Sequence, residues 1–505
     1  MAHITYQDYP KAPVVMDNLS VKFMKQSKFV PLEIDKGTLR IAMADPEDYY
    51  TIDALRLAYG LNTQVCEGRE EDILEAIERL YGAGTESLET IIEEAGRDIY
   101  DITPEGEEDA DYLRDLALEA PIIRLVNRLI LNAVDLRASD IHFEPYEDEF
   151  KVRYRIDGVL HEVESPPRRL QAAIISRVKI MAKLDIAERR LPQDGRIKLR
   201  ILDKEIDFRV STLPTLFGES LVMRILDRET LILDLEKLGF PEDILSDYIG
   251  LVSQPYGMIL VTGPTGSGKT STLYTTLAKI NSPENKIITL EEPVEYQLSG
   301  VNQIQVNPKI GMTFANGLRA IVRQDPDIIL VGEIRDRETA EIAIQSALTG
   351  HLLFSTLHTN DAAGAVTRLL DMGVENFLLS STLLGVLAQR LVRVICPHCR
   401  ESVSPEEKNL KSMGVELDEV SGVDFCAGRG CEECRYTGFK GRTAIFEYLP
   451  VNEYIRSEIT KKSSTERIKD AALKNGMTTL RQDGWLKVRQ GITTISEVLR
   501  VTLEK

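Results

Sequence analysis

A glycine-rich stretch that follows an apolar run constrains the fold more than any other feature of the chain. Residues 263–270 read GPTGSGKT and match the phosphate-binding pattern G-x-x-x-x-G-K-[ST]. The mostly apolar residues 258–262 predict a strand before the stretch, and Leu273, Leu277 and Ile280 give a following helix one apolar face. Backbone N–H groups of such a loop and the positive end of its helix surround phosphates, and glycines permit that close approach. The alternative, a glycine-rich turn without a ligand, requires neither the strand nor the helix.

Each residue of this loop is a candidate for contact with nucleotide. Lys269 would place a positive charge beside the phosphates, and Thr270 would provide a hydroxyl ligand for Mg²⁺. The candidate binding residues are Gly263, Pro264, Thr265, Gly266, Ser267, Gly268, Lys269, Thr270 and Ser271. We therefore expect a nucleoside triphosphate and Mg²⁺ to bind this part of the chain.

A nucleoside triphosphatase also needs a carboxylate at the carboxyl edge of its parallel strands, because the phosphates bind there. Residues 328–333 read IILVGE, so Glu333 ends a predicted strand at that edge. Asp325 and Asp327 precede the strand; at about 3.3 Å per residue, Asp327 would lie about 20 Å from Glu333. Glu333 is therefore the candidate that polarises the attacking water or holds it through Mg²⁺. The alternative is a solvated strand end without a catalytic role.

Other titratable residues flank neighbouring apolar runs. Glu291, Glu292 and Glu295 follow the run IITL, and we expect them at the same edge of the sheet unless they form a surface acidic turn. His351 and His358 flank the run LLFSTL, and we expect this strand to present both imidazoles near the phosphates. The alternative is that these histidines are structural.

Five of the six cysteines fall within 39 residues, and four of them form two C-x-x-C pairs separated by 31 residues. The paired residues are Cys396, Cys399, Cys431 and Cys434. This spacing is typical of a tetrahedral zinc site, and four thiolates leave no open position for water. We therefore expect a structural Zn²⁺, with a redox dithiol as the alternative. Cys426 is expected to be a bystander, although it or His398 could replace a ligand.

Charge and hydropathy exclude several classes of protein. The chain of 505 residues has a net charge of −19, and residues 84–120 alone contain 13 acidic against two basic residues. No stretch is basic enough for general binding to a nucleic-acid backbone. No run of eighteen apolar residues and no signal-peptide pattern occur. We therefore expect no nucleic-acid partner, a cytoplasmic location, and membrane association only through partners.

Length and hydropathy pattern divide the chain into several folded parts. Residues 1–83 predict a small mixed α/β module without catalytic residues, which we interpret as a partner-docking module, and residues 84–119 predict an acidic linker. Residues 120–234 combine helix-like and strand-like patterns, which indicates an α+β domain. Residues 235–505 contain short apolar runs between helical patterns, which is typical of an α/β domain with a parallel sheet. The cysteine pairs place an insert at about residues 394–440.

Taken in order, these motifs closely resemble those of the type II secretion and type IV pilus assembly ATPases, over nearly the whole chain. Besides the phosphate loop and the cysteine pairs, the resemblance rests on ASDIHFEP (138–145), RYRIDG (153–158), LPQDGR (191–196), DFRVSTLPT (207–215), EEPVEY (291–296), LRAIVRQDPDIILVGEIRD (318–336) and TGHLLFSTLHTN (349–360). It implies a RecA-like P-loop motor domain at residues 235–505, preceded by the smaller α+β domain. It also implies a homo-hexameric ring.

The resemblance implies that the ring uses ATP to drive a pilus-like fibre from the cytoplasmic face of the inner membrane. The N-terminal module would dock onto an inner-membrane protein, and a polytopic inner-membrane platform protein would be a second partner. The chain length and the short N-terminal module resemble the type II secretion ATPase, which assembles a pseudopilus, and the type IV pilus assembly ATPase is the close alternative. Two alternatives from other classes are a nucleic-acid translocase and an ATP-binding scaffold with vestigial hydrolysis. The lack of a basic tract opposes the first, and intact Lys269 and Glu333 oppose the second.

The resemblance also implies roles for residues of the motor domain. The phosphate-loop pair corresponds to Lys269 and Thr270, and the catalytic glutamate corresponds to Glu333. An acidic box corresponds to Glu291 and Glu295. Its second residue is Glu here, where the family commonly has Asp, which leaves the role of that residue open.

Two further groups follow from the same resemblance. His351 and His358 match a histidine box. Arg209 and Arg224 look like the arginines that reach nucleotide at subunit contacts. Further candidates of this kind are Arg319 and Arg323. The alternative is that all four arginines are ordinary surface residues or members of ion pairs.

Overall fold

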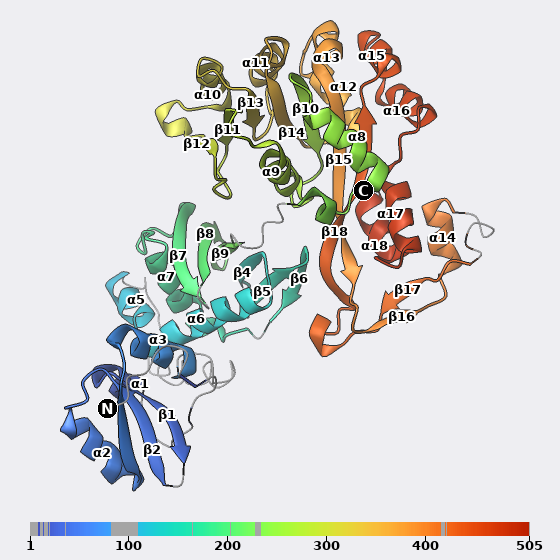
Figure 1. Cartoon of the computed structure of the whole chain (residues 1–505). Coiled ribbons are helices and arrows are strands. Elements are labelled where there is room, and N and C mark those ends of the chain that lie inside the picture. Colours follow the sequence, from blue (N-terminus) through green and yellow to red (C-terminus); the bar gives the residue numbers. More distant parts are fainter. Residues whose placement is uncertain are drawn as a thin grey trace. The chain divides into compact units, whose positions relative to one another are not determined.

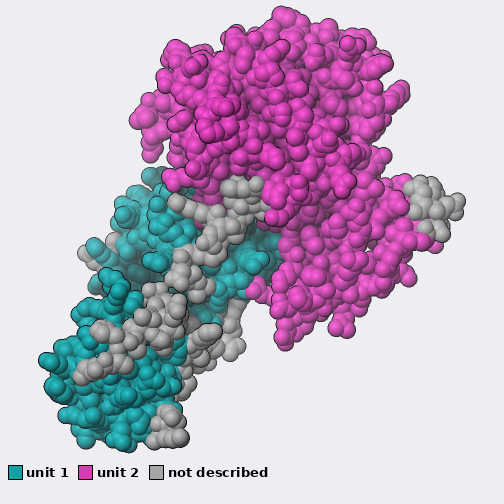
Figure 2. Space-filling model, in the orientation of Figure 1, with its two compact units in different colours: residues 1–225 teal, residues 226–505 magenta. Residues whose placement is uncertain are grey.

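The computed structural model describes most of the chain. The described residues are 9–10, 14, 19, 21–35, 37–81, 110–163, 165–201, 204–227, 234–415, 420 and 422–503. The chain divides into two compact units, residues 1–225 (unit 1) and residues 226–505 (unit 2), as Figure 2 shows. None of the helices in these described ranges is both long enough and apolar enough to cross a bilayer.

The first part of unit 1 is a three-stranded sheet with three helices. Its elements are α1 (Val21–Gln26), β1 (Phe29–Asp35), β2 (Thr38–Met43), α2 (Tyr49–Tyr59), β3 (Asn62–Glu67) and α3 (Glu70–Tyr81). β1 pairs antiparallel with β2, and β2 pairs in parallel with β3. Leu39, Ile41 and Met43 alternate along β2 as the sequence predicts, and they form one buried core with Ile73 and Ile77 of α3. The mixed α/β character expected of this module is confirmed.

The second part of unit 1 is a six-stranded sheet covered by helices. Its elements are α5 (Ala110–Ala117), α6 (Ala120–Asp135), β4 (Asp140–Pro145), β5 (Phe150–Ile156), β6 (Val159–Glu162), α7 (Gln171–Met181), β7 (Gln193–Ile201), β8 (Lys204–Thr215) and β9 (Gly218–Asp227). The strand order is β6-β5-β4-β9-β8-β7. The predicted α+β character is confirmed. α5 lies within the range that the sequence assigns to the acidic linker, and residues 84–109 of that range lie outside the described residues.

α6 shows how the sequence specifies these elements. Glu119 caps it in an extended conformation and a proline occupies its first turn, where the missing N–H costs no hydrogen bond. Ile122, Val126, Leu129 and Ala133 recur at helical spacing and are completely buried in the core of this domain. The helix therefore covers the sheet with its one apolar face.

The core of unit 2 is a seven-stranded sheet. Its strands are β10 (Gly257–Thr262), β11 (Ile287–Glu291), β12 (Val301–Gln305), β13 (Ile328–Val331), β14 (Leu352–Leu357), β15 (Leu383–Ile395) and β18 (Phe439–Pro450), in the order β12-β11-β13-β14-β10-β15-β18. The first six strands are parallel, as predicted, and β18 pairs antiparallel with β15. Figure 1 shows β15 and β18 running on together beyond the other strands.

Helices pack around this sheet on both faces (Figure 1). They are α8 (Glu242–Val252), α9 (Lys269–Ile280), α10 (Phe314–Ile321), α11 (Arg337–Leu348), α12 (Ala362–Asp371), α13 (Asn376–Thr382), α15 (Glu453–Thr460), α16 (Thr465–Lys474), α17 (Leu480–Arg489) and α18 (Ile495–Thr502). Every residue of β10 is buried, and Met258 and Leu260 join one apolar core while Ile259 and Val261 join the other. Such continuous burial is what a parallel sheet between two helical layers requires.

The insert lies between β15 and β18. It contains β16 (Arg400–Ser402), α14 (Glu407–Met413) and β17 (Cys426–Gly428), and β16 pairs antiparallel with β17. The two long strands hold both ends of the insert side by side, because Ile395 of β15 is paired with Phe439 of β18.

Candidate nucleotide site and cysteine cluster

The parallel register brings the ends of four strands of unit 2 to one edge. Thr262, the last residue of β10, is paired with Leu357, the last residue of β14. Val331, the last residue of β13, is paired with Leu290 of β11. The chain segments that leave this edge carry the phosphate loop, Glu291, Glu333 and His358. The structure therefore brings together the residues that the sequence places at carboxyl strand ends.

The phosphate loop adopts a conformation that depends on glycine. Gly263, Gly266 and Gly268 have positive φ angles of 152°, 79° and 90°. A Cβ at Gly263 would come within 2.6 Å of the Gln389 carbonyl oxygen. Gly268 caps α9, whose first backbone N–H groups have no partner within the helix and so form an anion site. Thr270 is exposed in the first turn, where its hydroxyl is free to serve as a Mg²⁺ ligand.

Lys269 is buried at the start of α9. Its ammonium donates hydrogen bonds to the carbonyl oxygens of Gly263 (2.6 Å) and Pro264 (3.1 Å). Burial lowers the pKa of Lys269 to about 8; the charge of Glu333 opposes this shift, and the charge of Arg390 adds to it. The lysine therefore holds the loop in shape and lies where phosphates bind.

Glu333 lies between two groups that can neutralise its charge. Its Oε2 is 3.4 Å from Nε2 of His358, and its Oε1 accepts a hydrogen bond from Arg335. The second guanidinium nitrogen of Arg335 donates to Glu292 at 3.1 Å. Glu292 is thus tied to Glu333 through one arginine. A mostly buried carboxylate beside an imidazole suits proton acceptance or the orientation of a water molecule.

The acidic box is held by hydrogen bonds to buried side chains. Glu291 accepts hydrogen bonds from the hydroxyl of Tyr274 on α9, from Thr289 Oγ1 (2.5 Å) and from Gln303 Nε2 (3.2 Å). The backbone N–H of Glu295 donates to the same Tyr274 hydroxyl at 3.3 Å. Burial, together with the charge of Glu291, raises the pKa of Tyr274, so the phenol stays protonated as a donor. The box is therefore fastened to the helix that leaves the phosphate loop.

The expected position of His351 is wrong. This residue precedes β14, and β14 starts level with the first residue of β10. Its Nδ1 lies 2.8 Å from the carbonyl oxygen of Ser346, at the edge of the sheet opposite the phosphate loop. β14 separates it from His358 by seven steps along the strand, about 23 Å at about 3.3 Å per residue. Of these two histidines, only His358 lies beside Glu333.

The contacts described above involve none of the four candidate arginines. Arg209 on β8 and Arg224 on β9 belong to unit 1, where Arg224 Nε donates to Asp140 Oδ1 at 3.1 Å. In unit 2, Arg319 donates to Glu338 at 2.6 Å and Arg323 donates to the Arg319 carbonyl oxygen at 2.6 Å. Their proposed roles toward nucleotide therefore stay predictions.

The sequence analysis missed several residues that support the site. Tyr274 and Gln303 hold Glu291, and Gln389 and Arg390 of β15 pack against the phosphate loop. No short motif marks the first two. Gln389 and Arg390 do have a signal in the sequence, because they are polar residues inside the apolar run LLGVLAQRLVRVI. Polar side chains in a buried strand need hydrogen-bond partners.

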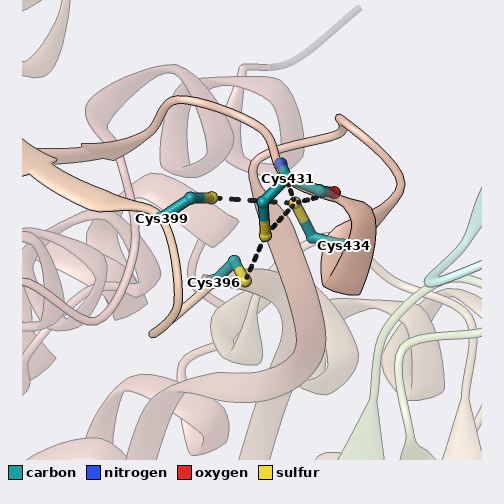
Figure 3. A group of neighbouring side chains, drawn as sticks. All are labelled: Cys396, Cys399, Cys431 and Cys434. Carbon is teal, nitrogen blue, oxygen red and sulfur yellow. Dashed lines mark hydrogen bonds between the residues drawn. The ribbon is translucent and has the colours of Figure 1, made fainter.

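The four cysteines of the C-x-x-C pairs form a compact cluster (Figure 3). The Sγ–Sγ distances are 3.9 Å for Cys396–Cys431, 3.7 Å for Cys399–Cys434 and 3.7 Å for Cys431–Cys434. These distances are far longer than a disulfide bond. They match the separation of about 3.8 Å that tetrahedral Zn–S bonds of about 2.3 Å require.

Two further observations fit a metal at this cluster. Backbone N–H groups of Gly430 and Cys431 point at the sulfurs of Cys399 and Cys434, at 3.3 and 3.2 Å, as is usual around metal thiolates. Of the described His, Cys, Asp and Glu residues, these four cysteines alone form such a group, so it includes neither Cys426 nor His398.

Two family models match the chain. The model described as "Type II/IV secretion system protein" matches residues 115–500, and the model described as "MshEN domain" matches residues 1–87. The first match includes the phosphate loop, Glu333 and all four clustered cysteines. The second match includes the three-stranded module of unit 1.

Characterised relatives match over almost the whole chain. The type II secretion system protein E of Xanthomonas campestris pv. campestris is 54% identical over 489 residues, which are 96% of this chain and 85% of the relative. The type IV pilus assembly ATPase PilB of Myxococcus xanthus is 46% identical over 498 residues, which are 98% of this chain and 88% of the relative.

Solved structures share the fold. The pilus retraction motor PilT with bound ADP gives a TM-score of 0.52 at 27% identity, over 74% of this chain and 96% of that chain. The ATPase DotB of Legionella pneumophila gives a TM-score of 0.55 at 21% identity, over 74% of this chain and 94% of that chain, and shows the fold alone.

The burial of Lys269 makes nucleotide binding sensitive to pH. The free lysine is charged below about pH 8 and neutral above it, and bound phosphates favour the charged form. We expect the affinity for ADP to be constant below this pKa and to fall toward about tenfold per pH unit above it, because binding then takes up a proton. The measurement is titration with a fluorescent ADP analogue from about pH 7 to about pH 10, a range in which the terminal phosphate, with a second pKa of about 6, stays ionised.

The control for this profile is the exposed Lys279 in the last turn of the same helix. Lys279→Met should keep both the affinity and its decline above about pH 8. Lys269→Met should bind weakly and show no decline. Equal affinity for ADP in Lys269→Met and in the unmodified protein at about pH 7 contradicts the assignment of Lys269 as the phosphate-binding cation.

Proposed function

This chain belongs to the family of type II/IV secretion system proteins, and we propose that it is the ATPase motor of type II protein secretion, which drives assembly of a pseudopilus. The observation that carries the proposal is the phosphate loop with Glu333 and His358 at the same edge of one parallel sheet. A phosphate-binding loop with a buried lysine and a carboxylate at the same edge supports a phosphoryl-transfer site.

The proposed reaction is hydrolysis of ATP. Backbone N–H groups at the start of α9 and the ammonium of Lys269 would receive the β- and γ-phosphates. Mg²⁺, when bound through Thr270, neutralises phosphate charge. Glu333 would orient the attacking water and accept its proton, and His358 would stabilise the carboxylate in the correct position. The acidic box, fixed by Tyr274, would complete the polar surroundings of Mg²⁺ with Glu291 and Glu295.

Assembly of a type IV pilus is the second candidate function. The observation that favours it is the 46% identity to a pilus assembly ATPase over 98% of this chain. The two functions share the reaction and differ in the fibre. Deletion of the gene, followed by assays of protein export and of surface pili, distinguishes them: loss of export with normal pili supports secretion.

We propose that the cysteine cluster binds one structural Zn²⁺. Four thiolates complete the coordination shell, so the metal would hold the insert of residues 394–440 together and take no part in hydrolysis. The complete set of four ligands favours this role over a redox dithiol, for which one free pair suffices.

We also propose a homo-hexamer that attaches to the cytoplasmic face of the inner membrane through partners. In this arrangement residues 1–83 dock onto an inner-membrane protein, residues 84–119 act as the linker, and residues 120–234 form the domain that precedes the motor of residues 235–505 in the chain. A polytopic platform protein would receive the force. Because no tract of the sequence is strongly basic, we expect ATP turnover to be unchanged by single-stranded DNA.

The catalytic assignment is tested by Glu333→Gln and Lys269→Ala. The first variant should bind ATP normally and hydrolyse it at least about a hundredfold more slowly, because the amide cannot accept the proton of the water. The second should lose both affinity and turnover. Phosphate release and nucleotide binding are the measurements, and Glu341→Gln, which alters an exposed glutamate of α11, is the control. Wild-type turnover in Glu333→Gln would refute the assignment.

The zinc proposal is tested by elemental analysis and by serine substitutions. The purified protein should contain one Zn²⁺ per chain, and serine at Cys396, Cys399, Cys431 or Cys434 should lower the zinc content and expose the insert to proteolysis. Cys426→Ser removes a buried cysteine outside the cluster and should retain the metal. Purified protein without zinc, with all four thiols free toward a thiol reagent, would refute the proposal.

The ring mechanism is tested by dilution and by Arg209→Ala and Arg224→Ala. Turnover per chain should rise with protein concentration, because these arginines belong to unit 1 and must be delivered to the phosphates by closure or by a neighbouring subunit. Each substitution should lower kcat about tenfold or more while changing ADP affinity little. Arg190→Ala, at an arginine of unit 1 whose side chain is 88% exposed, is the control. Full activity in a dilute monomeric sample would exclude the mechanism.

A further inference from the structure

β15 continues past the edge of the sheet at which its neighbour β10 ends. Thr262 is paired with Ala388, so the next two residues of β15, Gln389 and Arg390, lie level with the phosphate loop. Only 1% of Gln389 and 8% of Arg390 are exposed. Burial of two adjacent polar side chains in an apolar strand costs free energy unless hydrogen bonds compensate for it, so their contacts are informative.

Both ends of the phosphate loop pack against this pair. A Cβ at Gly263 would lie 2.6 Å from the carbonyl oxygen of Gln389 and 3.1 Å from Nη1 of Arg390. A Cβ at Gly268 would lie 2.7 Å from Nε2 of Gln389. The Oε1 of Gln389 also accepts a hydrogen bond of 2.7 Å from Thr272 on α9. The two glycines therefore allow the loop to rest directly on β15.

Arg390 reaches in the other direction to the segment that follows β14. Its Nη2 donates to the carbonyl oxygen of Asn360 at 2.8 Å and approaches Oδ1 of the same residue at 3.3 Å, and its Nη1 donates to the Gln389 carbonyl oxygen at 3.0 Å. Asn360 follows His358 by two residues, and His358 contacts Glu333. One guanidinium therefore connects the phosphate loop to the segment that carries the imidazole.

The charge of Arg390 has no direct counterpart. Within the described part of the chain its hydrogen bonds go to carbonyl and amide oxygens, and it forms no ion pair. Burial lowers its pKa, while the charges of Glu447 on β18 and Asp361 before α12 act in the opposite direction. A guanidinium stays protonated in proteins, so a fixed positive charge lies beside Lys269. The negative charge that faces Lys269 is that of Glu333.

We propose that Arg390 is a positioning residue of the nucleotide site, which holds the His358 segment against the phosphate loop and adds positive potential where the phosphates bind. Its planar fork can donate to two carbonyl oxygens at once, and a lysine at this position could not. Gln389 supports the same contact at the other end of the loop. The inference rests on the proposed ATP hydrolysis at this loop.

Two substitutions separate the contributions of charge and of shape. Arg390→Gln removes both the charge and the fork, so the affinity for ADP and kcat should each fall about tenfold. Arg390→Lys keeps the charge and loses the fork, so its affinity for ADP should stay within about threefold of that of the unmodified protein. Its kcat should still fall about tenfold, with a KM for ATP within about threefold of the unmodified value.

Arg393→Gln is the matched control. Arg393 lies on the same strand, is mostly buried and forms an ion pair with Glu497, so its loss perturbs β15 without touching the loop. This variant should be less stable to heat and should keep both the affinity for ADP and kcat.

Several outcomes would overturn the proposal. It fails if Arg390→Gln keeps the ADP affinity and turnover of the unmodified protein, or if Arg393→Gln lowers both equally, because the effect is then a general one of β15. Should Arg390→Gln not fold, a folded Arg390→Lys with unchanged kcat contradicts the proposal by itself. Failure of the proposed function is recognisable separately, because Glu333→Gln would then hydrolyse ATP at the unmodified rate.

Discussion

The structure of unit 2 depends on the central position of β10. This strand is buried over its whole length between β14 and β15, and its residues contribute alternately to the two apolar cores of the sheet. Because all three strands are parallel, the loop after β10 and the segment after β14 leave the sheet at one edge. A shift of β10 by one residue would turn each of its side chains to the opposite face of the sheet and would also displace the loop. The packing of the core therefore fixes the geometry of the site.

The parts of the site that the sequence predicted are those with a local signature. The loop glycines, Lys269, Glu333 and the two cysteine pairs each follow from a short pattern whose chemistry requires those residue types at that spacing. The supporting residues have no such signature. Tyr274 reaches Glu291 across 17 positions, and Thr272 reaches Gln389 across 117 positions, so these contacts arise only when distant elements pack.

The error over His351 has a simple geometric cause. A strand that crosses the whole sheet carries its two flanking residues to opposite edges, and β14 crosses it between His351 and His358. The same rule separates Asp327, which accepts a hydrogen bond from the Lys286 N–H at the start of β13, from Glu333 at its end. The arginines of unit 1 are a different case, since their distance from nucleotide depends on the arrangement of units and subunits rather than on local sequence.

β15 also restricts which changes of chain length the protein can tolerate. Arg390 and Cys396 are separated by five residues of β15, which pairs regularly with β18 as far as Arg393 and again at Ile395, with a shift in register between these two residues. Deletion or insertion of one residue in the regularly paired part would turn the side chains on one side of the change to the opposite face, since side chains alternate along a strand. Natural variation in chain length should therefore occur within the insert, between Cys399 and Cys431. The stretch from Arg390 to Cys396 should keep a constant number of residues.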